Sequence, residues 1–94
     1  MIWLSFDMEG CIMKRYTAKS MLATAFSFDQ ADLEDYRYHY GRTSRPVYAI
    51  GQRYFCAVKL GQKPAVHRDG MVWDWQKYDS PFAEANGWQI WVAE

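Results

Sequence analysis

Cysteine is scarce in this sequence, and its scarcity excludes two classes of small protein. Only Cys11 and Cys56 occur among the 94 residues, which is too few for the disulfide framework of a secreted miniprotein. Their separation also lacks the paired spacing of a zinc or redox site. We expect two buried free thiols, because a free cysteine usually packs as a small hydrophobic side chain. A single Cys11–Cys56 bridge is the alternative.

Long apolar runs and glycine-rich loops are missing as well. The opening segment carries Asp7 and Glu9 where a secretory signal needs uninterrupted apolar residues, and no later run approaches the ~20 residues of a membrane span. The six glycines stand singly, so no phosphate-binding loop is present. No cluster of His, Cys and carboxylate residues has the spacing of a metal site. We therefore expect a cytoplasmic protein without cofactor, metal or membrane contact.

Aromatic residues are abundant instead, with five Trp, seven Tyr and five Phe, and half of the chain is apolar. This composition lies far from that of disordered chains, and the length suits one compact domain over residues 1–94. Segment 1–12 is a candidate extension, because Met13-Lys14-Arg15 resembles an ordinary translation start. Its two-residue alternation of apolar and polar side chains nevertheless predicts a strand.

Apolar periodicity predicts the helices. One stripe of helical period follows the N-cap residue Thr17 and predicts a main α-helix at about 17–26. A weaker helix is predicted over 27–35, with Asp29 as its cap. A short helix near 81–86 is predicted from Ser80 at the N-cap, with proline next to it and Asn-Gly after its end.

Two-residue alternation predicts the strands. The pairs Gly51-Gln52 and Asp69-Gly70 each predict a hairpin turn, since glycine accepts the positive φ that such turns require. Together the elements predict an α+β fold, an antiparallel sheet of about five to six strands with the main helix packed on one face. The predicted strands are 36–40, 47–50, 53–60, 65–68, 71–78 and 88–93.

The formal net charge of zero conceals a segregation of charge along the chain. Segment 36–68 carries seven basic residues and no acidic one, whereas the blocks on both sides are acidic. Five of the seven are Arg, whose guanidinium pairs with carboxylates or phosphates and stacks on rings. We interpret the segment as a contact surface; the alternative is a solvated face that the acidic blocks neutralise. The seven are Arg37, Arg42, Arg45, Arg53, Lys59, Lys63 and Arg68.

The tract Tyr36-Arg37-Tyr38-His39-Tyr40 alternates within that segment. In a strand its three tyrosines would share one face, and Arg37 with His39 the other. If exposed, the tyrosines form an interaction surface of residue types that are common at binding hot spots. If buried, they belong to the core, with their hydroxyls at its rim. The sequence leaves both alternatives open.

The five tryptophans divide between core and candidate surface. Trp73, Trp75 and Trp88 share strand faces with apolar neighbours and are predicted core residues. Trp3 and Trp91 point away from the aliphatic side of their strands. We select Trp91 as a candidate anchor for a partner, because a Trp anchor commonly contributes more binding energy than its neighbours.

Catalytic signatures are weak. His39 and His67 would be the acid and base of an RNA-cleaving site, with an Arg to stabilise the phosphorane charge. No spacing rule brings the two histidines together, so we predict no catalytic residue. A small His-dependent ribonuclease is kept as the third alternative.

We predict a non-enzymatic protein-binding module that covers a surface on a larger partner. By analogy of size and composition alone, it would be an inhibitor or adaptor of phage or plasmid type, directed at a host nucleoprotein or a CRISPR-like defence complex. The alternative is a single-stranded nucleic-acid-binding domain that uses segment 36–68. The predicted binding residues are Tyr36, Arg37, Tyr38, His39, Tyr40, Arg42, Arg45, Arg53 and Trp91.

Overall fold

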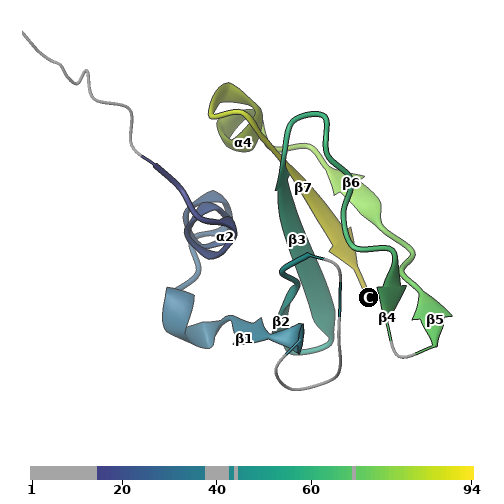
Figure 1. Ribbon diagram of the computed structural model, residues 1–94. Coiled ribbons are helices and arrows are strands. Elements are labelled where there is room, and N and C mark those ends of the chain that lie inside the picture. Colours follow the sequence, from purple (N-terminus) through teal and green to yellow (C-terminus); the bar gives the residue numbers. More distant parts are fainter. Residues whose placement is uncertain (1–14, 38–42, 44, 69) are drawn as a thin grey trace, which may run out of the picture.

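The structure is a computed structural model, and Figure 1 shows how its elements are arranged. It describes residues 15–37, 43, 45–68 and 70–94. Outside the described residues lie the strand predicted within 1–12 and the candidate binding residues Tyr38, His39, Tyr40 and Arg42.

A five-stranded antiparallel sheet forms the centre of the fold. Its strand order is β1-β2-β3-β7-β6, so β7, the last strand of the chain, lies between β3 and β6. A separate two-stranded sheet pairs β4 with β5. This topology confirms the predicted α+β class and the antiparallel sheet. The strands are β1 (Glu34–Asp35), β2 (Tyr48–Ile50), β3 (Arg53–Lys59), β4 (His67–Arg68), β5 (Met71–Val72), β6 (Gln76–Tyr78) and β7 (Trp88–Ala93).

Helix α2, Ala18–Phe26, begins and ends at local signals. Thr17 Oγ1 accepts the backbone N–H of Ser20 at 3.1 Å, and Ser20 Oγ accepts the N–H of Thr17 at 2.8 Å. This reciprocal cap satisfies two backbone donors of the kind that a helix start leaves unpaired. At the other end Ser27 takes a left-handed φ of 59° and stops the helix. The predicted main helix is confirmed.

The α-helix predicted over 27–35 is wrong. Asp29 does cap a helical turn, because its Oδ1 accepts the N–H of Ala31 at 3.0 Å, but the turn is the 3-10 helix η1, which spans only Gln30–Asp32. Leu33 then enters the core with 3% of its surface exposed, and the chain continues as β1 against β2. Burial of Leu33 and strand pairing outweigh the weak helical preference of this polar segment.

The predicted strand 36–40 is also corrected at its start. Tyr36 and Arg37 have helical backbone geometry. The N–H of Tyr36 donates to the carbonyl of Val47 at 2.8 Å, one residue beyond the β1–β2 ladder. Pairing with β2 thus ends at Tyr36, where the backbone turns.

Both predicted glycine turns are confirmed. Ile50 faces Arg53 across the β2–β3 turn, where Gly51 has a φ of 60°. Gly70 has a φ of 77° between the paired strands β4 and β5. An L-residue with a side chain would strain the backbone at either place.

The strand predicted over 71–78 is divided between two sheets. Strand β5 ends at Val72, and β6 begins at Gln76 beside β7. Between them Trp73 is buried, and the indole N–H of Trp75 donates to the carbonyl of Ala65 at 2.6 Å. These contacts bend the chain from the small sheet to the large one, so the interrupted alternation reflects tertiary packing.

The short helix α4, Pro81–Ala85, matches its prediction. Ser80 Oγ accepts the N–H of Ala83 at 3.3 Å, and Pro81 takes the first helical position, where no N–H is needed. Lys77 Nζ lies 3.2 Å from Glu84 Oε2 and ties β6 to α4. No helix among the described residues is long and apolar enough to cross a membrane.

Both faces of the sheet are covered. Consecutive residues of β3 point to opposite sides, and the side chains on each side pack into a separate cluster. On one face Phe55 packs with Met21 and Leu22 of α2 and with Ile90 of β7. In Figure 1, α2 and the β4–β5 hairpin lie on opposite sides of β3 and β7.

The second face is covered by aromatic and aliphatic side chains from irregular segments. Cys56 and Val58 of β3 pack there with Val47, Ala65 and Trp73. Neither α2 nor α4 contributes to this cluster, so its burial depends on Tyr36 and Val47 and on the chain between β3 and β6.

We expect Ile90→Ala to lower the free energy of unfolding by about 2–5 kcal/mol, because Ile90 is fully buried in the helix-covered core and its truncation leaves a cavity. Urea unfolding followed by tryptophan fluorescence measures the change. Gln76→Ala on the neighbouring strand is exposed and serves as the control, with a change of about 0.5 kcal/mol or less. Equal effects of the two substitutions would contradict this placement of the core.

Candidate interaction surface

The β4–β5 hairpin carries three exposed aliphatic side chains. The exposed fraction is 50% for Val66, 57% for Met71 and 62% for Val72. Arg68 faces Met71 and His67 faces Val72, so Met71 and Val72 point to opposite faces of the hairpin. Exposure on both faces means that the tip of the hairpin projects from the body of the protein. Exposed apolar side chains that gather on one element are typical of interaction sites.

The base of the hairpin is held firmly against the sheet. Trp73 is 5% exposed, and its backbone N–H donates to the carbonyl of Val66 at 2.9 Å. Its ring stacks on that of Trp75 with the centroids 4.7 Å apart. The indole N–H of Trp75 reaches the fully buried Ala65. The projecting side chains are therefore presented by a fixed support.

Arg68 lies half-buried at this base between two aromatic rings. Its guanidinium carbon is 4.4 Å from the centroid of Trp73 and 5.6 Å from that of Tyr54, distances at which cation–π attraction operates. Its Nε is buried and has no hydrogen-bond partner among the described residues. The indole nitrogens of Trp73 and Trp91 are likewise buried and find no acceptor in that part of the chain. Donors without acceptors therefore accumulate on this side of the sheet.

The basic residues of segment 36–68 are divided between the two faces of the sheet. Arg53 and Lys59 point to the helix-covered face. There Arg53 Nε lies 4.0 Å from Glu94 Oε2. Lys59 Nζ lies 5.5 Å from the centroid of the Trp88 ring. Arg68 packs against the opposite face. Among the described cations, the run of positive charge in the sequence does not become one continuous surface.

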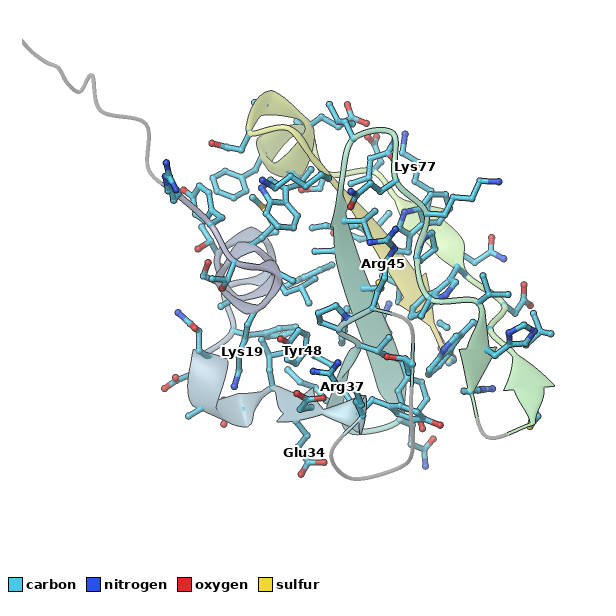
Figure 2. The ribbon with its side chains drawn as sticks, viewed as in Figure 1. Lys19, Glu34, Arg37, Arg45, Tyr48 and Lys77 are labelled. Atoms are coloured by element: carbon cyan, nitrogen blue, oxygen red, sulfur yellow. The ribbon has the colours of Figure 1, made fainter. Side chains whose placement is uncertain are left out.

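Arg37 and Arg45 lie apart from each other, as Figure 2 shows. The N–H of the exposed Arg37 donates to Asp35 Oδ1 at 3.0 Å, at the end of β1. The half-buried Arg45 donates from Nη1 to Gln62 Oε1 at 3.4 Å. Neither forms one of the two ion pairs of the described residues.

Tyr36 and Trp91, two other predicted binding residues, contribute to the core. Tyr36 is 5% exposed and meets the rings of Tyr54 and Trp73 edge to face. Trp91 is partly buried against the same cluster, opposite Cys56. The buried alternative therefore holds for Tyr36, whose ring is not free to contact a partner. It faces inward because the chain turns helical there instead of continuing as a strand.

Chemistry at the described residues is limited. The Cys56 thiol is fully buried, and burial raises its pKa, so little thiolate forms at neutral pH. His67 is exposed on β4, while His39 lies outside the described residues. No group of three or more His, Cys, Asp or Glu residues among those described could hold a metal ion.

A shallow hollow of about 400 Å³ opens at the end of β6 and β7. Asp74 and Glu94 line it beside Arg53 and Lys77. Because both signs of charge meet there, it selects neither anions nor cations.

Sequence reasoning missed the exposed hairpin. The pair Asp69-Gly70 indicated the turn, but Val66, Met71 and Val72 were interpreted as parts of longer, half-buried strands. The sequence carries no signal of this exposure, because only the structure shows that the pairing is limited to two residues on each side.

Searches of protein-family models, curated proteins and solved structures found nothing that matches this chain.

We expect Trp75→Phe to lower the free energy of unfolding by about 1–3 kcal/mol, because it removes the indole N–H that donates to the buried Ala65 carbonyl. The amide of Trp73, which bonds to Val66, should then exchange its hydrogen faster. Equilibrium unfolding and hydrogen exchange measure the two effects. Met71→Ala, at an exposed hairpin position, is the control and should change neither by much.

A second prediction concerns Tyr48 on β2. Burial raises the pKa of the Tyr48 phenol above its ordinary value of 10.0. The Asp35 carboxylate raises this pKa further, to a smaller extent, and Arg37 lowers it. The unfolded chain then loses this proton at a lower pH than the folded chain, so stability falls as pH rises above about 10. We expect Tyr48→Phe to flatten this fall relative to the unaltered protein in urea unfolding at pH 8–11. An unchanged slope would contradict the shift.

Proposed function

We propose that this chain is a non-enzymatic protein-binding module and that its contact surface is the β4–β5 hairpin. One observation supports the proposal above the others. Val66, Met71 and Val72 expose half or more of their side chains on a hairpin whose base is fixed by Trp73 and Trp75.

The energetics of association favour this use of the hairpin. Each Å² of apolar surface removed from water contributes about 25 cal/mol, so covering these three side chains is favourable. Association also has to offset the entropy lost when flexible groups become ordered. Because the stacked tryptophans and the Ala65 hydrogen bond already order the base, little of that loss remains for binding.

A protein partner fits this surface better than a nucleic acid does. Stacking of bases needs exposed rings and a row of cations, whereas Trp73 is buried and the described cations divide between two faces. We further predict that the module is an inhibitor or adaptor directed at a nucleoprotein or defence complex. Identifying the partner tests this prediction.

The test is capture of partners from a lysate of the source organism, before and after nuclease treatment. We expect a protein that is retained after nuclease treatment and lost by at least about tenfold with the double variant Met71→Asp, Val72→Asp, because charges replace the apolar contacts. Leu60→Asp is the matched control, since Leu60 is 51% exposed but lies outside the hairpin.

Two results would contradict the proposal. Retention of the same partner by the hairpin variant would place the contact elsewhere on the molecule. Loss of the partner on nuclease treatment would favour the nucleic-acid alternative.

A further inference from the structure

Arg68 stands at the centre of one face of the β4–β5 hairpin. Met71 lies directly opposite it across the ladder, and Val66 precedes it by two residues on the same face. Both neighbours are at least half exposed. The Arg68 side chain therefore shares its face of the hairpin with two exposed apolar side chains, and its guanidinium lies over the Trp73 ring.

The guanidinium has no anionic partner among the described residues. The two ion pairs of those residues are Arg53 with Glu94 and Lys77 with Glu84, and Arg68 belongs to neither. Its Nε is buried, so an anion from outside would have to pair with the Nη groups, which are not among the buried unpaired atoms. A hydrogen bond from a charged donor is among the strongest. The outer end of the Arg68 guanidinium therefore lacks a counter-ion among the described residues.

We propose that Arg68 is the docking point for a carboxylate of the protein partner, with Val66 and Met71 covered by apolar side chains beside that carboxylate. The planar guanidinium fork matches a carboxylate, and cation–π contact with Trp73 and Tyr54 fixes its orientation before binding. A phosphate has the same charge. The aliphatic flanks and the burial of Trp73 favour a protein, because a nucleic acid would need further cations and open rings. This inference rests on the proposed function and names the chemistry of its partner.

The test uses the full chain labelled with ¹⁵N and ¹³C-methyl methionine and two blocked peptides, acetyl-Leu-Glu-Leu-amide and acetyl-Leu-Gln-Leu-amide. We expect the Glu peptide to shift the Arg68 Nε–H and Met71 methyl resonances, and the Gln peptide to bind about tenfold more weakly, because it lacks the charge. Arg68→Lys keeps the charge but not the fork and should weaken binding of the Glu peptide about tenfold. Arg53→Lys, outside the hairpin, is the matched control and should leave it unchanged.

Equal binding of the Glu and Gln peptides would overturn the proposal, as would the absence of any shift at Arg68. Tighter binding of a hexathymidylate at Arg68 than of the Glu peptide would overturn it in favour of phosphate. If Arg68→Lys fails to fold, the comparison of the two peptides on the unaltered chain decides alone. The proposed function is judged separately: a partner lost only with the Met71→Asp, Val72→Asp variant keeps the hairpin as the contact surface even where carboxylate docking fails.

Discussion

The aromatic stack around Trp73 is the contact on which the second face of the sheet depends. Helices α2 and α4 cover the first face in the ordinary way, with Phe55 and Ile90 beneath them. Neither α2 nor α4 covers the second face, so large flat rings exclude water from Cys56 and Val58 there. Trp73 does so by contacting Tyr36, Tyr54 and Trp75 together. Aromatic side chains suit this task because each buries a large area from few residues.

This solution has consequences for the surface. Once Trp73 and Trp75 are turned inward, the strand that precedes them is left as a hairpin of two residue pairs that is anchored only at its base. Half or more of the surface of its apolar side chains stays exposed. Arg68, which lies over the Trp73 ring, has no anion beside it among the described residues. Covering the exposed apolar side chains would be favourable, which is why we propose the hairpin as the contact surface.

Much of the fold could be predicted because its signals are local. The cap at Thr17, the proline after Ser80 and the glycine at each hairpin turn act on backbone within a few residues of themselves. Their elements appear as predicted. The candidate site could be predicted less well, since exposure of Val66 or burial of Tyr36 is set by residues far away in the sequence. Alternation along a strand indicates two faces but not which of them is covered.

The amino-acid sequence by itself determined the helices α2 and α4, the glycine turns and the antiparallel class, because these follow from capping, periodicity and positive φ. It also determined that segment 36–68 is basic. Only the tertiary structure decided that Arg53 and Arg68 lie on opposite faces, that Tyr36 is buried, and that the strand predicted over 71–78 divides at Trp73. The physical reason is the second face of the sheet. Covering it requires rings drawn from distant segments, and the demand of that face for burial outweighs local alternation wherever the two conflict.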